Sequence, residues 1–240
     1  MKAMKNSPTH VALIPDGNRR WARKKGLPPW VGHQAGVKTF EKILIKVKDL
    51  KIPYFTFWSG SWDNLTKRPK KEINFLFKVY TQQFERLIKD KRVHQNKINV
   101  NVIGRWQEIL PLKTQKLIKK AIEITKDYTS FYLTFLLAYD GRDELISCIK
   151  NIVNLSKKNP DIKITPQLIK ESLWTKKLPP VDLVIRTGCE GDPHNSAGFM
   201  MWDTAYSQLY FTETLFPAFT QKEFEKIIKD FLKRERRLGA

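Results

Sequence analysis

Asp16 lies in a short polar run whose residue types suit a phosphorylated ligand. The run, Pro15-Asp-Gly-Asn-Arg-Arg-Trp21, combines a carboxylate, a glycine turn and two guanidinium groups. Backbone N–H groups in a tight glycine turn can line a phosphate, and arginine adds bidentate contacts. The Asp16 carboxylate could hold Mg²⁺ that bridges phosphate oxygens, because this ion favours a carboxylate together with substrate phosphates. Taken alone, the run still favours an ordinary Asp-Gly turn flanked by surface charge.

Two further polar segments also follow apolar runs. Ser59 to Arg68 mixes hydroxyl, amide, carboxylate and guanidinium groups, and its simpler interpretation is a polar loop that leads into a helix with Pro69 near its first turn. The third segment begins at Arg186 and ends near Trp202. An arginine directly after an apolar strand suits an anionic ligand, although a surface loop that caps a helix would look similar. Each segment is only moderately specific by itself.

The elements that must position these segments alternate between short β-type runs and longer helical runs. Apolar periodicity and alternation predict strands at 10–14, 54–58, 98–102, 131–138, 181–185 and 208–211. Helices are expected at about 33–50, 69–89, 111–126 and 142–157, after an N-cap at Thr165 with Pro166, and after a capping box at Thr220 and Glu223. This α/β alternation predicts a mostly parallel central sheet wrapped by helices. Ligands bind beyond the carboxyl ends of such strands, so the three polar segments should converge on one site.

Length and composition predict a single domain. The 240 residues are 41% hydrophobic and contain no internal repeat or Gly/Ser linker, so we expect one domain over 1–240 with residues 1–8 flexible. The longest stretch without a charged residue runs for twelve residues from Tyr128 to Tyr139, whereas a membrane-spanning helix needs about 20. The first residues lack the apolar core of a secretory signal, and we therefore expect a cytoplasmic protein.

The charge balance indicates anionic partners. The chain has 44 Lys+Arg against 24 Asp+Glu, a net charge of +20, which attracts nucleic acid, anionic membrane surfaces or phosphorylated small molecules. Charge alone does not choose among them, but no nucleic-acid recognition motif is present, so we expect no nucleic-acid partner. The two cysteines match no metal or redox spacing; Cys148 is expected to be a small core residue, and Cys189 lies in a glycine-rich loop.

In their order and spacing, these segments resemble the cis-prenyltransferase family of the undecaprenyl diphosphate synthase type. The matching elements are Asp16-Gly-Asn-x-Arg-Trp-Ala22, Gly32-His-x-Ala-Gly36, Asp63-Asn64 with Arg68-Pro69, Asp182-Leu-Val-Ile-Arg-Thr-Gly188, Ala205-Tyr-x-x-Leu-Tyr-Phe-Thr212 and the ending Arg234-Glu-Arg-Arg-Leu-Gly239. The resemblance implies a parallel sheet wrapped by helices with a hydrophobic product tunnel, and usually a homodimer. It also implies Mg²⁺-dependent condensation of isopentenyl diphosphate onto an allylic diphosphate primer, giving a polyprenyl lipid-carrier precursor that would bring the protein into transient contact with a membrane surface.

The resemblance also assigns roles to individual residues. It places Mg²⁺ at Asp16, and it gives substrate binding at the first segment to Gly17, Asn18, Arg19, Arg20 and Trp21, together with His33. Ser61, Asn64 and Arg68 would lie near the reacting carbons, with Asn64 in proton removal and with Trp62 and Asp63 beside the substrate. Arg186, His194, Asn195 and Ser196 would hold isopentenyl diphosphate. For His33, a helix-start histidine bonded to backbone is the simpler alternative. Residues 75–77 and 131–138 could line the tunnel, although core packing is their main expected role.

These residue types suit the reaction. Ionisation of the allylic C–O bond leaves a diphosphate anion, and cations at that end stabilise the transition state. The isopentenyl double bond then attacks the allylic carbon, and a weak base removes one proton. Holding two diphosphates side by side supplies much of the rate through orientation.

Several positions depart from the family pattern. Arg19 replaces a glycine, Pro29 replaces a phosphate-binding arginine, and Gln208 replaces a second metal-associated glutamate. The second segment has one extra residue, and the third is about three residues longer and offers His194 or Asn195 in place of an arginine. Two alternatives stay open: a member with an altered outcome, either short-chain or head-to-middle, and a non-catalytic partner subunit. Product length and primer are not determined by the sequence.

Overall fold

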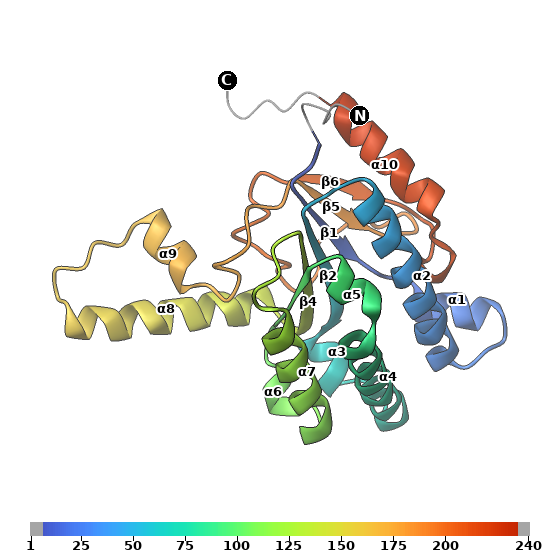
Figure 1. The fold of residues 1–240 in the computed structure, drawn as a ribbon, viewed down its shortest axis with the longest axis horizontal. Helices are drawn as coiled ribbons and strands as arrows, with labels where there is room; N and C mark the ends of the chain where they lie inside the picture. The colour runs from blue at the N-terminus through green and yellow to red at the C-terminus, as the bar shows by residue number, and fades with distance from the viewer. Residues whose placement is uncertain (1–6, 235–240) are drawn as a thin grey trace.

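The computed structural model describes residues 7–234. Within that range, one sheet of six strands in the order β3-β4-β2-β1-β5-β6 forms the centre of the molecule, and every neighbouring pair is parallel (Figure 1). The strands are β1 (His10–Ile14), β2 (Tyr54–Ser61), β3 (Ile98–Ile103), β4 (Phe131–Tyr139), β5 (Leu183–Arg186) and β6 (Gln208–Phe211). The predicted α/β fold with a parallel sheet is confirmed.

Long crossover segments connect the strands, as parallel pairing requires. These segments contain helices except between β5 and β6, where residues 187–207 form a loop. The helices are α1 (Asn18–Lys24), α2 (Pro29–Asp49), α3 (Trp62–Thr66), α4 (Lys70–Lys89), α5 (Lys91–Gln95), α6 (Trp106–Ile109), α7 (Leu112–Thr125), α8 (Gly141–Lys158), α9 (Pro166–Ser172) and α10 (Gln221–Lys233), with a 3₁₀ turn η1 (Phe216–Ala218). The predicted caps are confirmed, because the Thr165 hydroxyl accepts from the Leu168 amide and the Thr220 hydroxyl accepts from the Glu223 amide.

Four short helices, α1, α3, α5 and α6, were not predicted, and α3 changes the second polar segment. Residues 59–68 were expected to form a loop, but β2 continues to Ser61 and α3 follows directly. The register of β2 against β4 shifts on both sides of Gly60, and the Ser61 hydroxyl accepts the Asn64 amide 3.0 Å away. Helices of four to seven residues show too little periodicity to be recognised in sequence.

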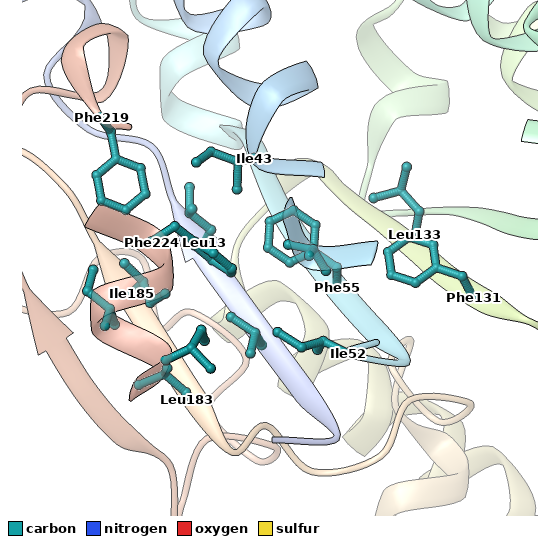
Figure 2. Packing of buried hydrophobic residues seen from close by; sticks show 14 of the residues in the cluster. Leu13, Ile43, Ile52, Phe55, Phe131, Leu133, Leu183, Ile185, Phe219 and Phe224 are labelled. Carbon is teal, nitrogen blue, oxygen red and sulfur yellow. The ribbon is translucent and has the colours of Figure 1, made fainter. Parts of the chain in front are cut away.

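The core packs against both faces of the sheet. All five residues of β1 are buried, as expected for a central parallel strand covered on both sides. On one face, Ile43 from α2 and Phe224 from α10 pack over Leu13 and Phe55 (Figure 2). On the other face, Phe199 and Met200 join a second buried cluster. Cys148 is buried against Ile152 and Leu173, which confirms it as a core residue, and burial raises the pKa of its thiol.

Other expectations concern the chain ends and membranes. The predicted flexible segment falls on residues 1–6, outside the described part, and on Ser7 and Pro8, of which Pro8 is buried. The closing motif also lies outside it from residue 235 onward. Among the described helices, none combines the length and apolar character needed to cross a bilayer. The location of the protein in the cell stays a prediction.

Candidate active site

The carboxyl ends of four adjacent strands, β4, β2, β1 and β5, surround a polar cavity of about 580 Å³, here named the charged cavity. In an open parallel sheet this edge is where ligands bind. The predicted site residues that line it are Asp16, Gly17, Asn18, Arg19, Arg20, His33, Ser61, Asp63, Asn64, Arg68, Arg186 and Ser196. The three polar segments therefore converge, as the sequence predicts.

Asp16 stands at the centre of this edge on a constrained turn. Gly17 has φ of +101°, and a Cβ atom there would lie 2.7 Å from the Leu215 side chain, so only glycine fits. The Gly17 amide donates to Asp16 Oδ1 at 2.5 Å, and the Thr187 hydroxyl donates to the Asp16 carbonyl at 2.9 Å. These bonds fix the backbone, while the carboxylate keeps 38% exposure toward the cavity.

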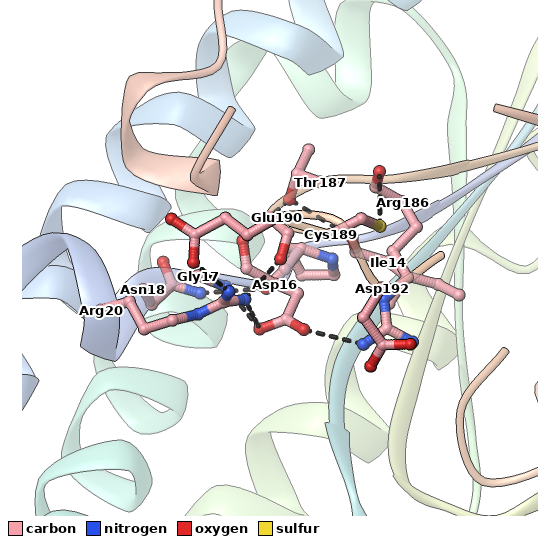
Figure 3. Close-up of polar contacts among 12 residues, drawn as sticks. Ile14, Asp16, Gly17, Asn18, Arg20, Arg186, Thr187, Cys189, Glu190 and Asp192 are labelled. Atoms are coloured by element: carbon pink, nitrogen blue, oxygen red, sulfur yellow. Dashed lines mark hydrogen bonds and ion pairs between the residues drawn. The ribbon is translucent and has the colours of Figure 1, made fainter. Parts of the chain in front are cut away.

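Arg186 carries the buried cation that faces this carboxylate. Its side chain is 6% exposed, and Nη2 donates to Asp16 Oδ2 at 2.8 Å (Figure 3). Nη1 donates to the His194 carbonyl at 2.9 Å and to the Ser196 hydroxyl, so Arg186 holds the long loop after β5 against the Asp16 turn. Its Nε is buried and has no partner among the described residues.

Arg20 is held on the outer side of Asp16 by the same loop. Its guanidinium lies 3.2 Å from Asp16 Oδ1 and donates to Glu190 Oε2 at 2.6 Å (Figure 3). Glu190 also accepts from Lys24 at 2.7 Å. The hydrogen bonds from Lys24 and Arg20 lower the pKa of Glu190. Burial alone would lower the pKa of Arg20, but the Asp16 and Glu190 carboxylates outweigh burial and raise the pKa of this guanidinium.

Glu72 connects three basic side chains on the opposite side of the cavity. It lies in the first turn of α4 with a 5% exposed side chain, and Oε1 accepts from His33 Nε2 at 3.1 Å and from Arg68 Nη1 at 3.0 Å. Arg19 Nε lies 3.6 Å from Oε2. Burial would raise the pKa of Glu72, but the His33 hydrogen bond and the charges of Arg68 and Arg19 outweigh it, so the pKa is lowered. His33 therefore bonds a carboxylate and not backbone, unlike the simpler alternative.

Two glycines bring α2 close enough to place His33 there. A Cβ atom at Gly32 would lie 2.0 Å from the Asn18 carbonyl oxygen, and one at Gly36 would lie 2.3 Å from Asn18 Oδ1. The Gly32-His-x-Ala-Gly36 motif thus serves close helix packing, with His33 between the glycines. Asn18 Nδ2 donates to the Pro15 carbonyl at 3.1 Å, whereas Oδ1 is buried with no partner among the described residues.

Five predicted site residues do not line the charged cavity: Trp21, Trp62, His194, Asn195 and Gln208. The two tryptophan rings instead make cation–π contacts. Lys25 Nζ lies 4.6 Å from the centre of the Trp21 ring, and the Arg105 guanidinium lies 3.7 Å from the centre of the Trp62 ring. His194 Nδ1 contacts Asp192, and only the His194 carbonyl reaches Arg186. Asn195 Oδ1 accepts the following backbone amide.

Gln208 lies at the opposite end of the strands from Asp16. It pairs with Leu183, three residues before Arg186, which corresponds to a separation of about 10 Å along the sheet. Its Oε1 accepts from Arg234 at 3.3 Å. Within one chain, the structure does not bring Gln208 and Asp16 together into the shared metal site that we expected. Periodicity placed Gln208 correctly at the start of a strand, but the resemblance did not show which end of the sheet it occupies.

Several cavity residues were missed. Arg23, Asp140 and Arg142 line the charged cavity, and the Asp140 carboxylate caps α8 by accepting the Arg142 amide and guanidinium. The signal was present, because Asp140-Gly-Arg142 follows the strand at 131–138 as directly as Asp16 follows β1. Glu72 gave no such signal, because it lies inside an amphipathic helix.

A second cavity, of about 450 Å³, lies between α2, α4 and the sheet and is here named the apolar cavity. Phe131, Leu133, Phe135 and Leu137 line it, as predicted for this strand, whereas only Leu76 of 75–77 does so. The two cavities share the lining residues Pro15, Asn18, His33, Ser59, Leu76 and Tyr80. A polar chamber therefore leads directly into an apolar one.

Comparison with known proteins identifies the family of this chain. The family model for undecaprenyl diphosphate synthase matches residues 14–239. The chain belongs to the undecaprenyl diphosphate synthase family. It is a prenyltransferase that carries out cis-prenyl chain elongation, as the sequence motifs predict.

Individual relatives within and around this family cover almost the whole chain. A tritrans,polycis-undecaprenyl-diphosphate synthase (geranylgeranyl-diphosphate specific) of Pyrococcus furiosus is 41% identical, covering 97% of this chain and 87% of its own length. An isoprenyl transferase of Clostridium tetani is 36% identical, covering 98% and 90%. The crystal structure of lavandulyl diphosphate synthase from Lavandula x intermedia with dimethylallyl diphosphate has a TM-score of 0.90 at 28% identity, covering 98% and 99%.

Proposed function

We propose that this cis-prenyltransferase adds isopentenyl diphosphate units to geranylgeranyl diphosphate and gives a polyprenyl diphosphate for a lipid carrier. The observation that carries the proposal is the continuity of the two cavities through His33, Asn18 and Tyr80. A diphosphate suits the charged cavity and an isoprenoid chain suits the apolar one. The allylic C–O bond would then lie where they meet. The specificity printed for the Pyrococcus relative favours the geranylgeranyl primer.

In this proposal, different residues of the charged cavity bind the two substrates. Asn18, Arg19, Arg20 and His33 bind the allylic diphosphate, and the positive charge of Arg19 and Arg20 stabilises the leaving anion. Arg186 and Ser196, already bonded to one another, hold isopentenyl diphosphate across from Asp16. Asn64, which lines the same cavity, helps to remove the proton after the new C–C bond forms.

Mg²⁺ fits the donor set at Asp16. No cluster of three His, Cys, Asp or Glu suited to a metal occurs among residues 7–234, so an all-protein cage is not offered there. One accessible carboxylate is what Mg²⁺ uses when substrate phosphates and water complete its coordination. When bound, the ion supplies positive charge to the diphosphate oxygens. Asp16 would hold it, after exchanging its bond with Arg186 for the metal.

We also propose that two copies associate through α8. This helix projects with α9 from one side of the molecule (Figure 1). Ile146, Ile149 and Val153 are 50%, 60% and 47% exposed, and their spacing places them on one face. Exposed aliphatic side chains at this spacing mark an association surface. Ile149→Glu should give a monomer by light scattering, whereas Leu112→Glu on α7, exposed by 74%, should not. Transient contact with a membrane surface stays a prediction.

The test of the reaction is incorporation of radiolabelled isopentenyl diphosphate. Dimethylallyl, geranyl, farnesyl and geranylgeranyl diphosphate are compared as primers, with Mg²⁺ and with excess chelator. The expected result is a polyprenyl product that needs Mg²⁺ and forms fastest with geranylgeranyl diphosphate. If saturating Mg²⁺ and all four primers gave no product, the partner-subunit alternative would replace the proposal.

A second candidate is condensation of two allylic diphosphates. The close structural similarity to lavandulyl diphosphate synthase with dimethylallyl diphosphate favours it, and so does the absence of a second arginine in the loop after Arg186. Product analysis with dimethylallyl diphosphate alone separates the two candidates, because only the second gives a product without isopentenyl diphosphate.

A further inference from the structure

Glu72 on α4 is a buried carboxylate next to the charged cavity. Its side chain is 5% exposed, and it contacts three basic side chains from three different segments. Arg19 comes from α1, His33 from α2, and Arg68 from the turn before α4. All three line the charged cavity, while Glu72 itself lies behind them.

The contacts are directional. A carboxylate only accepts hydrogen bonds, so the 3.1 Å contact requires that His33 Nε2 donates its proton to Glu72 Oε1. The same oxygen accepts from Arg68 at 3.0 Å, which orients one edge of that guanidinium and leaves other N–H groups for the cavity. One carboxylate against two guanidinium groups leaves one positive charge in excess to attract a diphosphate.

These groups lie where the two cavities meet. His33 lines both cavities, and Leu76, one helical turn after Glu72, does so too. In the proposed reaction, the breaking C–O bond lies at the same junction. Displacements of about 1 Å in groups around a reacting bond can lower rates on the order of 100-fold. A residue that holds Arg68 and His33 in position is therefore needed for the full rate.

We propose that Glu72 is a positioning residue that holds Arg68, His33 and Arg19 toward the allylic diphosphate at the junction of the two cavities. The inference rests on the proposed function, because that function places the leaving diphosphate of the allylic substrate beside these three basic side chains. Glu72 acts through its neighbours and touches no substrate. Its removal therefore lowers turnover more than it lowers ground-state binding, since the lost carboxylate leaves the cavity more positive.

The test compares Glu72→Gln with Glu85→Gln, a matched change on the same helix at a surface carboxylate paired with Lys113. For Glu72→Gln we expect kcat to fall on the order of 10- to 100-fold, with KM for both diphosphates unchanged or lower. Binding of inorganic pyrophosphate, measured by calorimetry, should be as tight as in the wild type or tighter. Glu85→Gln should match the wild type throughout. Wild-type kcat in Glu72→Gln, or weaker pyrophosphate binding in the folded variant, overturns the proposal.

A double-mutant cycle separates positioning from general structural support. If Glu72 acts through Arg68, combining Glu72→Gln with Arg68→Lys should cost little more in kcat than the larger single change. Fully multiplicative losses overturn the proposal, because they mean that the two residues act independently. If Glu72→Gln does not fold, Glu72→Asp keeps the charge but shortens the reach; it should still lower kcat, and wild-type kcat in this variant overturns the proposal.

The pyrophosphate measurement needs no turnover, so the two proposals can fail separately. Absence of any condensation by the wild-type protein counts against the proposed function. Weaker pyrophosphate binding by Glu72→Gln, with an unchanged melting temperature, counts against the positioning role alone.

Discussion

Two carboxylates on opposite sides of the charged cavity are built in contrasting ways. Glu190 belongs to the loop after β5, is 33% exposed, and pairs with Arg20 and Lys24. Glu72 belongs to a helix, is 5% exposed, and pairs with His33 and Arg68. Exposed pairs contribute little and exchange readily, whereas a buried carboxylate cannot leave its partners without a large cost. In the proposed function, Arg20 can therefore pass from Glu190 to a substrate phosphate, while Arg68 stays in contact with Glu72.

Asp16 stands between these extremes. Its turn is fixed by Gly17 and Thr187, yet its carboxylate is 38% exposed and faces the buried cation of Arg186. The backbone of the Asp16 turn is thus held in place, as the Glu72 side chain is. The Asp16 carboxylate, like that of Glu190, is accessible enough to change its ion-pair partner. In the proposed function, this combination would let Asp16 exchange its bond with Arg186 for a metal–diphosphate complex.

The largest expected effect comes from removing the central carboxylate. Asp16→Ala should lower kcat on the order of 10²- to 10³-fold, because one strong electrostatic contact to the developing charge is lost. The fold should persist, since Arg186 keeps its bonds to Ser196 and the His194 carbonyl. Steady-state kinetics and circular dichroism check both statements. A folded variant with wild-type turnover would make Asp16 an ordinary turn residue.

Narrowing the apolar cavity should shorten the product without stopping the reaction. Leu44, on the face of α2 that lines this cavity, has room on its cavity side. Leu44→Trp should therefore shift the product distribution to fewer isoprene units, as seen by reversed-phase chromatography. Leu112→Trp adds the same bulk on the exposed face of α7 and serves as the control. An unchanged distribution in Leu44→Trp would separate the apolar cavity from the growing chain.

The buried carboxylate of Glu72 should make the folding stability of the protein depend on pH. The pKa of Glu72 is lowered in the folded state from an ordinary value of 4.5. A lowered carboxyl pKa adds stability above the unfolded-state pKa, and this stability is lost as the pH falls through the folded-state pKa. The stability difference between the wild type and Glu72→Gln should thus be constant above about pH 5 and shrink in more acidic solution. Urea unfolding at several pH values measures it, and a constant difference down to pH 3 contradicts the assignment.

Substitution of the more exposed carboxylate, Glu190, should have the smallest effect on the kinetics. Glu190→Gln releases Arg20 and Lys24, so KM for a diphosphate substrate should fall only a few-fold, because solvent-exposed ion pairs contribute little. The decrease should disappear at high salt because such pairs are screened. Kinetics at two ionic strengths provide the measurement. A rise in KM would show that Glu190 orders the loop and does not compete with substrate.

Local sequence determined most of the helices and strands of this protein and the segments that supply the site residues. Apolar patterns placed each strand to within a few residues, and the polar runs after β1, β2 and β5 predicted a common site because carboxyl ends of parallel strands meet at one edge. The family motifs then gave the reaction. The same reasoning could have found Asp140 and Arg142, which follow β4, had that run been considered.

Only the tertiary structure decided which polar residues form ion pairs and which side chains line the charged cavity. Glu72 is 53 residues from Arg19 in the sequence, and its buried contacts depend on the close packing that Gly32 and Gly36 allow between α1 and α2. Gln208 carries a suitable ligand atom, yet the register of β6 places it at the far end of the sheet. Residue type and spacing are local properties, whereas burial and strand register depend on how distant segments pack, and so neither could be determined from the sequence.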